Sequence, residues 1–227
     1  IQATTSQPVV VENRAGAAGN IGIDIVRRGP PDGSSLLVIP AGNFTINPTL
    51  LRGLTWDVER DFAPILMLAG TPNLILANKD SGIRDLATLA AVARQRGDLP
   101  YGTPGVGSQL HLTMEVLKRR MNLPLTHVPY RGTTQAVPDL LSGQIPVMVS
   151  NLPVALPLIG NNQVNAVAVT TAARSPLAPE IPTLTEQGLA EIDVASWYGL
   201  FAPRATPAPI QEAIRAAAAA ALRAPQN

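Results

Sequence analysis

Four short loops contain the residue types that could bind a small anion. Each follows a candidate strand, and at least three of them precede a candidate helix. Backbone N–H groups at the start of a helix attract anions, and glycine lets the backbone approach a ligand closely. Several such loops on one rim of a sheet predict a site for a carboxylate, whereas any single loop is equally explained as an efficient turn. The candidate residues are Ala41, Gly42 and Asn43; Thr103, Gly105, Val106, Gly107 and Ser108; Tyr130, Arg131 and Gly132; and Ser150 and Asn151.

Two arginines stand in turns directly after candidate strands. Arg14 follows the Val9–Val11 run, and Arg131 follows Tyr130. A guanidinium group can bind a carboxylate with two parallel hydrogen bonds. It can equally clamp a loop carbonyl, and the sequence leaves both roles open.

Enzymatic motifs are absent from the glycine-rich segments. No lysine follows the last glycine of the Gly102–Ser108 loop, so this loop is not a P-loop. The glycines at 16, 19 and 22 have the spacing G-x-x-G-x-x-G, whereas the dinucleotide fingerprint needs G-x-G-x-x-G. No serine lies in a G-x-S-x-G elbow. We therefore predict no enzymatic activity; the alternative is an α/β enzyme that uses the Gly102–Ser108 loop to hold a phosphate or a nucleotide.

The titratable side chains also show no catalytic arrangement. His111 lies beside the apolar stripe of a candidate helix, near Glu115, and is expected to be exposed or capped. His127 lies in a candidate strand and is expected to be a hydrogen-bonded core residue. The remaining carboxylates of interest are expected to be solvated or to cap helices; they are Asp24, Asp57, Asp61, Asp139 and Glu186.

The composition excludes several other classes of protein. Lys and Arg number 17 against 16 Asp and Glu, so the net charge of +1 supplies no basic field for nucleic acid. The chain has no cysteine and two histidines, which excludes disulfides, iron–sulfur clusters and thiolate or His-rich metal sites. We expect no metal and no redox cofactor. No apolar run approaches the roughly 20 residues that cross a bilayer, so no direct membrane insertion is expected.

Alternating strand and helix patterns predict an α/β fold. The apolar runs are continuous, as in a parallel sheet that is covered on both faces. Strands are predicted at 9–11, 36–39, 65–68, 74–76, 126–128, 145–149, 164–169 and 198–201. Helices are predicted from the apolar spacing over 86–93 up to Gly97, over 110–121 with Ser108 as N-cap and a Glu115–Arg119 pair, from a Thr134 cap to Gly143, and from an Asn151 cap onward.

The ordered motifs of the chain resemble those of one protein family. The segment 10–22, Val-Val-Glu-Asn-Arg-Ala-Gly-Ala-Ala-Gly-Asn-Ile-Gly, is followed by 31–33 (Pro-Asp-Gly), 47–48 (Asn-Pro), 61–64 (Asp-Phe-Ala-Pro), 101–105 (Tyr-Gly-Thr-Pro-Gly), 130–132 (Tyr-Arg-Gly), 181–183 (Ile-Pro-Thr) and 197–203 (Trp-Tyr-Gly-Leu-Phe-Ala-Pro). This order is similar to that in the substrate-binding proteins of tripartite tricarboxylate transporters, the Bug (TctC-like) family of periplasmic receptors. The match covers nearly the whole chain.

The resemblance implies a two-lobe periplasmic binding protein fold of type II, with crossover strands. Lobe one is expected at 1–78 plus 195–227, and lobe two at 79–194. The resemblance also implies a periplasmic receptor that captures a small carboxylate and delivers it to membrane permease subunits, or presents it to a sensor. The ligand would be held by the loop at 41–43 from lobe one and by the loops at 103–108, 130–133 and 150–151 from lobe two.

The start of the chain departs from the family pattern. Family members normally carry a further strand, a Pro/Gly-rich loop and a helix before the Val-Glu-Asn-Arg segment, and that loop contributes to the ligand site. We therefore expect an N-terminally truncated chain whose first strand is missing and whose lobe one is incomplete. Loss of a central strand would expose a sheet edge and apolar surface, so reduced stability or self-association is expected.

Overall fold

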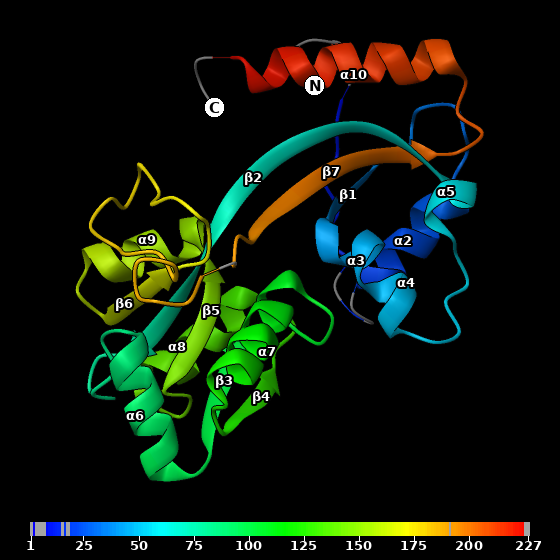
Figure 1. Ribbon diagram of the computed structural model, residues 1–227. Helices are drawn as coiled ribbons and strands as arrows, with labels where there is room; N and C mark the ends of the chain where they lie inside the picture. The colour runs from blue at the N-terminus through cyan, green and yellow to red at the C-terminus, as the bar shows by residue number, and fades with distance from the viewer. Residues whose placement is uncertain (1, 3–7, 15, 17–18, 191, 225–227) are drawn as a thin grey trace. The chain divides into compact units, whose positions relative to one another are not determined.

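The computed structural model describes residues 2, 8–14, 16, 19–190 and 192–224. Three positions of the 10–22 motif, Ala15, Ala17 and Ala18, lie outside the described residues. The chain divides into two units: unit 1 comprises 1–70 and 197–227, and unit 2 comprises 71–196. Two strands, β2 (Phe62–Asn78) and β7 (Ala195–Pro203), carry the chain from one unit to the other (Figure 1).

Unit 2 is built from strand–helix pairs. Its elements follow the second half of β2 in the order α6 (Leu86–Arg96), β3 (Leu99–Thr103), α7 (Gln109–Met121), β4 (Leu125–Pro129), α8 (Thr133–Ser142), β5 (Val147–Asn151), α9 (Leu152–Gly160) and β6 (Val164–Val169). Strand β3 pairs in parallel with β4 and with β5, whereas β2 pairs antiparallel with β5 and β6. The sheet is therefore mixed, and the prediction of a parallel sheet holds only for its β4–β3–β5 part.

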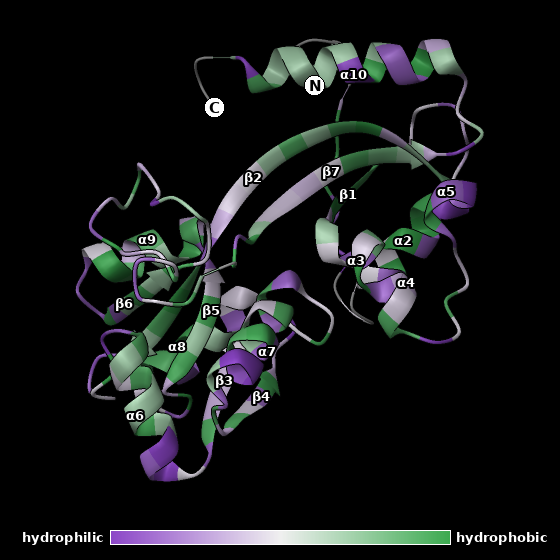
Figure 2. Ribbon diagram, in the orientation of Figure 1, coloured by the Kyte–Doolittle hydropathy of each residue, from purple (hydrophilic) through white to green (hydrophobic). Residues whose placement is uncertain are grey.

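Two apolar layers explain the continuous apolar runs of unit 2. Successive strand residues point to opposite faces of a sheet. Ile75 and Ala77 pack with α6 and α7 on one face, whereas Leu74 and Leu76 pack with α8 and α9 on the other. Both faces are covered, so the four consecutive residues Leu74 to Ala77 of β2 are all apolar and buried (Figure 2).

Unit 1 contains the remaining elements. These are α2 (Asn20–Arg27), β1 (Leu37–Pro40), α3 (Ala41–Thr45), α4 (Asn47–Leu50), α5 (Val58–Asp61), the first half of β2, most of β7 and α10 (Ala208–Leu222). Strand β1 pairs antiparallel with β7, from Leu37 opposite Phe201 to Pro40 opposite Tyr198. Four aromatic side chains pack together in the same core cluster as this strand pair. The ring centroid of Phe44 lies 5.4 Å from that of Trp56, 5.1 Å from that of Phe62 and 4.7 Å from that of Phe201.

Most helix boundaries agree with the sequence predictions, because the capping signals are local. Ser108 caps α7 by accepting the His111 N–H at 3.1 Å, and Gly97 and Gly143 end α6 and α8 with φ of 73° and 79°. The Thr134 cap is wrong, because α8 begins at Thr133 with Gly132 as N-cap. Glu115 contacts Tyr101 and Lys118 rather than the predicted Arg119.

Two strand predictions are wrong. The Val9–Val11 segment forms no strand, and Val10 and Val11 are each 81% exposed, because no strand pairs with it in the described part of the chain. The runs at 65–68 and 74–76 are not two strands but parts of the single strand β2. The turn signal at Gly70 and Pro72 does not break β2, since proline is tolerated where a strand needs no N–H donor.

Candidate functional site

The carboxyl ends of three parallel strands meet at one edge of the unit 2 sheet. Thr103, the last residue of β3, is in register with Pro129, the last residue of β4, and β5 runs parallel on the other side of β3. Each strand leads directly into a helix: β3 into α7, β4 into α8 and β5 into α9. The N-termini of these three helices therefore gather at the same edge (Figure 1). The predicted loops at 103–108, 130–132 and 150–151 are brought together there.

The loop from Thr103 to Ser108 is held by its own hydrogen bonds. The Gly105 N–H donates to Thr103 Oγ1 at 3.3 Å, and Ser108 Oγ donates to the Gly105 carbonyl at 2.8 Å. Gly105 and Gly107 have φ of 124° and 79°, which residues with a side chain rarely adopt. Val106 at the tip is 47% exposed. The loop is therefore a turn whose conformation is held by internal hydrogen bonds and whose tip lies at the surface.

The second loop joins the first through backbone and side-chain contacts. The Tyr130 N–H donates to the Thr103 carbonyl at 2.9 Å, and the Tyr130 hydroxyl donates to Asp139 Oδ2 at 2.6 Å. Burial, with the hydrogen bond to Asp139, raises the pKa of Tyr130 to about 12, so the hydroxyl keeps its proton. Arg131 is exposed, and Gly132 is the N-cap of α8. The only formal cation predicted for the site thus stands at its rim.

Three further polar residues, which were not predicted from the sequence, lie at this edge. Asn73 on β2 is opposite Asn151 on β5, Thr170 directly follows β6, and Ser196 lies at the start of β7. Together with Thr103, Ser150 and Asn151 they form a group of six buried polar side chains, each at most 9% exposed. We call these six residues the polar edge. Only strand pairing brings Asn73, Thr170 and Ser196 to this edge, so no local sequence signal marks these three residues.

Asn73 is the centre of the polar edge. Its Oδ1 accepts hydrogen bonds from Asn151 Nδ2 at 2.9 Å and from Ser196 Oγ at 2.7 Å, and its carbonyl accepts the Thr170 N–H at 3.0 Å. Asn73 is fully buried, and its Nδ2 has no hydrogen-bond partner among the described residues. A buried donor without an acceptor costs about 1–3 kcal/mol. A polar ligand atom beside Nδ2 would remove this cost.

The predicted loop of unit 1 begins helix α3 at the end of β1. Ala41, Gly42 and Asn43 are all buried. Gly19, the N-cap of α2, stands beside them, because a Cβ atom on Gly19 would lie 2.6 Å from Asn43 Nδ2. The starts of α2 and α3 are therefore neighbours within unit 1.

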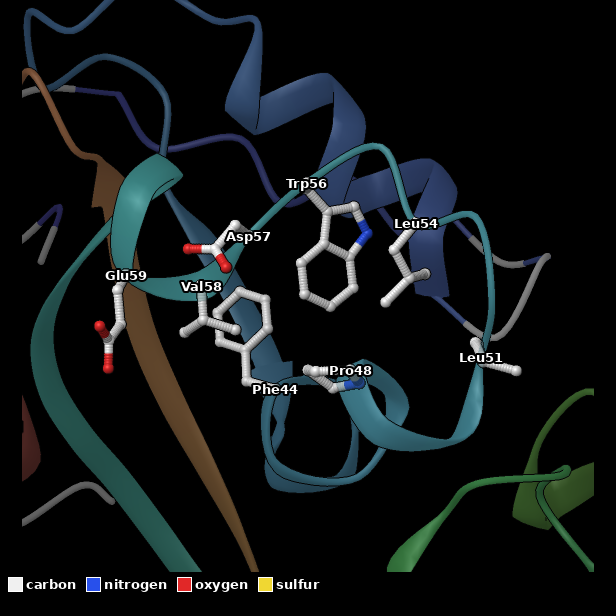
Figure 3. A pocket seen from close by; sticks show the side chains of 8 residues that line it. All are labelled: Phe44, Pro48, Leu51, Leu54, Trp56, Asp57, Val58 and Glu59. Atoms are coloured by element: carbon white, nitrogen blue, oxygen red, sulfur yellow. The ribbon is translucent and has the colours of Figure 1, made fainter.

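Two hollows of unit 1 lie next to this loop but do not include its residues. The first, of about 440 Å³, is lined by Phe44, Pro48, Leu51, Leu54, Trp56, Asp57, Val58 and Glu59 (Figure 3). The second, of about 410 Å³, shares Phe44, Val58 and Glu59 with it and adds Trp197 and Arg204. Aromatic and aliphatic walls with two carboxylates at the rim of the first hollow do not suit an anion.

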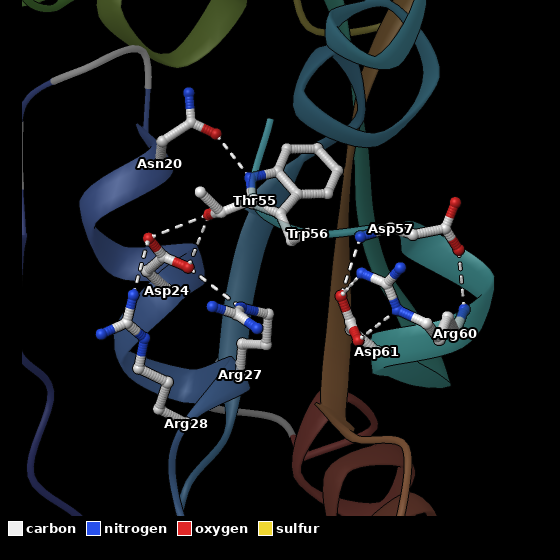
Figure 4. Close-up of polar contacts among 9 residues, drawn as sticks. All are labelled: Asn20, Asp24, Arg27, Arg28, Thr55, Trp56, Asp57, Arg60 and Asp61. Carbon is white, nitrogen blue, oxygen red and sulfur yellow. Dashed lines mark hydrogen bonds and ion pairs between the residues drawn. The ribbon is translucent and has the colours of Figure 1, made fainter. Parts of the chain in front are cut away.

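Three carboxylates of unit 1 form hydrogen bonds that stabilise the local structure. Asp24 accepts from Arg27 at 3.0 Å and from Thr55 at 3.1 Å, and Asp57 caps α5 through the Arg60 N–H at 2.8 Å (Figure 4). Asp61 pairs with Arg60, and this hydrogen bond lowers the pKa of Asp61 to about 2. The pKa values of Asp24 and Asp61 are lowered, with hydrogen bonds from arginine contributing, so these two carboxyl groups stay ionised and neither is poised as a general acid.

Arg14 pairs with Glu12 at 2.5 Å, and both side chains are more than half exposed. Among the described residues, no group of three or more His, Cys, Asp or Glu side chains is arranged to hold a metal ion. No helix within the described ranges combines the length and the apolar character needed to cross a membrane.

Comparison with known proteins connects this geometry to a family. The sequence pattern of the tripartite tricarboxylate transporter family receptor, TctC, matches residues 1–227. The chain belongs to this family. A curated relative from Pseudomonas sp. strain P51, a UPF0065 protein in a tcbD-tcbE intergenic region, is 36% identical over 221 residues, which are 96% of this chain and 66% of the relative. BugT of Bordetella pertussis is 31% identical over 91% of this chain and 64% of its own length. The chain thus spans slightly less than two thirds of these relatives.

Solved structures show the same fold. MatC from Rhodopseudomonas palustris with bound malate is 33% identical, with a TM-score of 0.92 over 99% of this chain and 76% of that one. A second R. palustris protein, with adipate, is 33% identical, with a TM-score of 0.94 over the same shares. The periplasmic binding protein BugD is 32% identical, with a TM-score of 0.92 over 99% of this chain and 75% of that one. The predicted α/β binding-protein fold and the family resemblance are confirmed.

Proposed function

We propose that this TctC-family receptor captures a small molecule with one or more carboxylate groups in the periplasm and delivers it to the membrane permease subunits of a tripartite transporter, without altering the ligand chemically. A sensor is the second partner to which the loaded receptor could be presented. The observation that carries the proposal is the polar edge, six buried polar side chains placed where three helix N-termini meet.

Burial of six polar side chains at one edge of the sheet costs free energy unless each of them is hydrogen-bonded. Asn73 keeps its Nδ2 amide group, which can donate two hydrogen bonds, without a partner among the described residues. The positive ends of three helix dipoles favour an anion at this edge. A carboxylate supplies acceptor oxygens for the Asn73 donor and for the first N–H groups of α7 and α8. Anion binding therefore matches both the charge and the hydrogen-bonding capacity of the edge.

The proposed ligand contacts in unit 2 are the residues predicted from sequence together with Asn73, Thr170 and Ser196. Arg131 at the rim adds a positive charge that steers an anion toward the edge. In unit 1, the loop at 41–43 stays the predicted ligand contact. We further propose that units 1 and 2 correspond to the two lobes of a binding protein.

The ligand class is supported by the structural neighbours. Malate and adipate, the molecules bound in the two R. palustris proteins, are both dicarboxylates. The 103–108 loop contains no lysine that could bind a phosphate group. This absence disfavours the alternative of an enzyme that holds a phosphate or a nucleotide. We therefore expect a dicarboxylate or a related acid as ligand.

Calorimetric titration of the purified protein with malate, adipate, citrate, benzoate and glutamate tests the proposal. We expect saturable binding of at least one acid. The Asn73→Leu variant loses the proposed donor and should bind that acid about 10- to 100-fold more weakly, as expected for a hydrogen bond to a charged group.

Thr113→Val is the matched control, because Thr113 is equally buried in unit 2 but donates to the Gln109 carbonyl within α7. The control should bind like the unchanged protein. Circular dichroism confirms that each variant is folded. Failure of the folded protein to bind any of the acids, or unchanged binding by Asn73→Leu, would contradict the proposal.

A further inference from the structure

Two imidazole rings lie stacked beneath the 103–108 loop. The rings of His111, on α7, and His127, on β4, have centroids 4.0 Å apart and planes inclined by 23°. These are the only two histidines of the chain. The ring of Tyr101, which is fully buried, also stacks with His127, and the two ring centroids are 5.2 Å apart. The pair is therefore a defined structural feature at the base of the loop.

Each ring is hydrogen-bonded to a different part of the loop. His127 Nε2 lies 2.6 Å from Thr103 Oγ1, at the residue where the loop begins. His111 Nδ1 accepts the Gly107 N–H at 3.4 Å, at the residue before the helix cap Ser108. The two contacts thus bracket the turn that contains Gly105 and Val106.

Burial of the pair favours the neutral form of both rings. Burial lowers the pKa of His111 and lowers the pKa of His127 to about 4. Glu115 lies 4.0 Å from His111 Nε2, but its Oε1 already accepts the Tyr101 hydroxyl at 2.6 Å and faces Lys118 at 3.8 Å. A neutral imidazole has one nitrogen that accepts a hydrogen bond, and His111 Nδ1 needs this form to accept the Gly107 N–H.

We propose that His111 and His127 are positioning residues that hold the 103–108 loop in its ligand-binding conformation from below, through the Gly107 N–H and the Thr103 hydroxyl. Neither ring is assigned a contact with the ligand. The inference rests on the proposed function in one respect: release of the loop should weaken the binding of an acid. The positions of the two loop contacts are independent of that function.

The two histidines use different ring nitrogens, which permits a crossed experiment. The side-chain oxygen of asparagine occupies nearly the place of Nδ1, and the terminal amide nitrogen of glutamine occupies nearly the place of Nε2. At position 111, His111→Asn should therefore preserve the contact with Gly107, and His111→Gln should lose it. At position 127 the order is reversed: His127→Gln should preserve the contact with Thr103, and His127→Asn should lose it.

The first readout is the backbone amide resonances of Gly105 and Gly107 in two-dimensional ¹H–¹⁵N spectra of all four variants. We expect the Gly107 resonance to move in His111→Gln but not in His111→Asn, and the Gly105 resonance to move in His127→Asn but not in His127→Gln. The second readout is the affinity for malate, or for whichever acid the unchanged protein binds. It should fall about three- to tenfold in the two disruptive variants only, as expected for one lost hydrogen bond.

A role of the rings in packing alone would affect Asn and Gln variants at each position without this crossed pattern. Equal resonance shifts for both variants at a position would overturn the inference, as would full affinity in the two disruptive variants. If the unchanged protein binds no acid, the proposed function fails. The amide resonances still decide whether the histidines hold the loop.

Discussion

Gly102 is closely packed within unit 2, directly before the 103–108 loop. A Cβ atom added to Gly102 would lie 2.5 Å from Ile145 Cδ1 and 3.2 Å from Tyr130 Cε2. Ile145 is 3% exposed, so its side chain has little room to move away. Extra volume in a well-packed core costs typically about 1–3 kcal/mol. We expect Gly102→Ala to lower the free energy of unfolding by this amount.

A second substitution should relieve the clash. Ile145→Val removes Cδ1, the atom nearest to the added methyl group. Alone it should cost about 0.5–1.5 kcal/mol, because it leaves a small cavity. In the double variant the new methyl group occupies part of that cavity. The double variant should therefore be more stable than the sum of the two single costs predicts, by about 1–2 kcal/mol, which is within the range measured for residues in contact.

Urea unfolding at neutral pH, followed by circular dichroism, measures this coupling. Gly102→Ala combined with Ile83→Val serves as the control, because Ile83 is fully buried in unit 2 but is not among the atoms nearest to Gly102. The control pair should be additive. Additive costs for Gly102→Ala and Ile145→Val would refute the packing argument, and so would a Gly102→Ala variant as stable as the unchanged protein.

Two further predictions concern stability. Burial lowers the pKa of His127 to about 4 from an ordinary value of 6.5. Between pH 4 and pH 6.5 the unfolded chain therefore binds more protons at this residue than the folded protein does. The free energy of unfolding should fall as the pH drops from 6.5 toward 4. Urea unfolding at pH 7 and pH 5 should show a smaller fall for His127→Gln; an equal fall would contradict the assignment. Asp85 forms a capping box with Thr88 at the start of α6, so Asp85→Ala should cost about 1 kcal/mol and Asp85→Asn less, measured in the same way.

Local signals in the sequence were sufficient for the helices of unit 2 and for the candidate loops. Caps act within three or four residues, which is why the sequence alone identifies Ser108, Gly97 and Gly143 as helix ends. Strand partners are chosen over long distances. The segment at 9–11 is as apolar as a true strand, yet it stays unpaired among the described residues.

The candidate site likewise combines features that are local in the sequence with features that depend on the tertiary structure. Glycine and helix-start residues mark the loops at 103–108 and 130–132 in the sequence itself, because their conformations need those residue types. The centre of the polar edge depends on contacts across 78 residues, from Asn73 to Asn151, and across 123 residues, from Asn73 to Ser196. The stacking of His111 on His127 likewise depends on the packing of α7 against the sheet. The amino-acid order by itself determined the family, the loops and the helix ends. The sheet topology alone decided which distant polar side chains share one edge, because backbone pairing between strands carries no local sequence code.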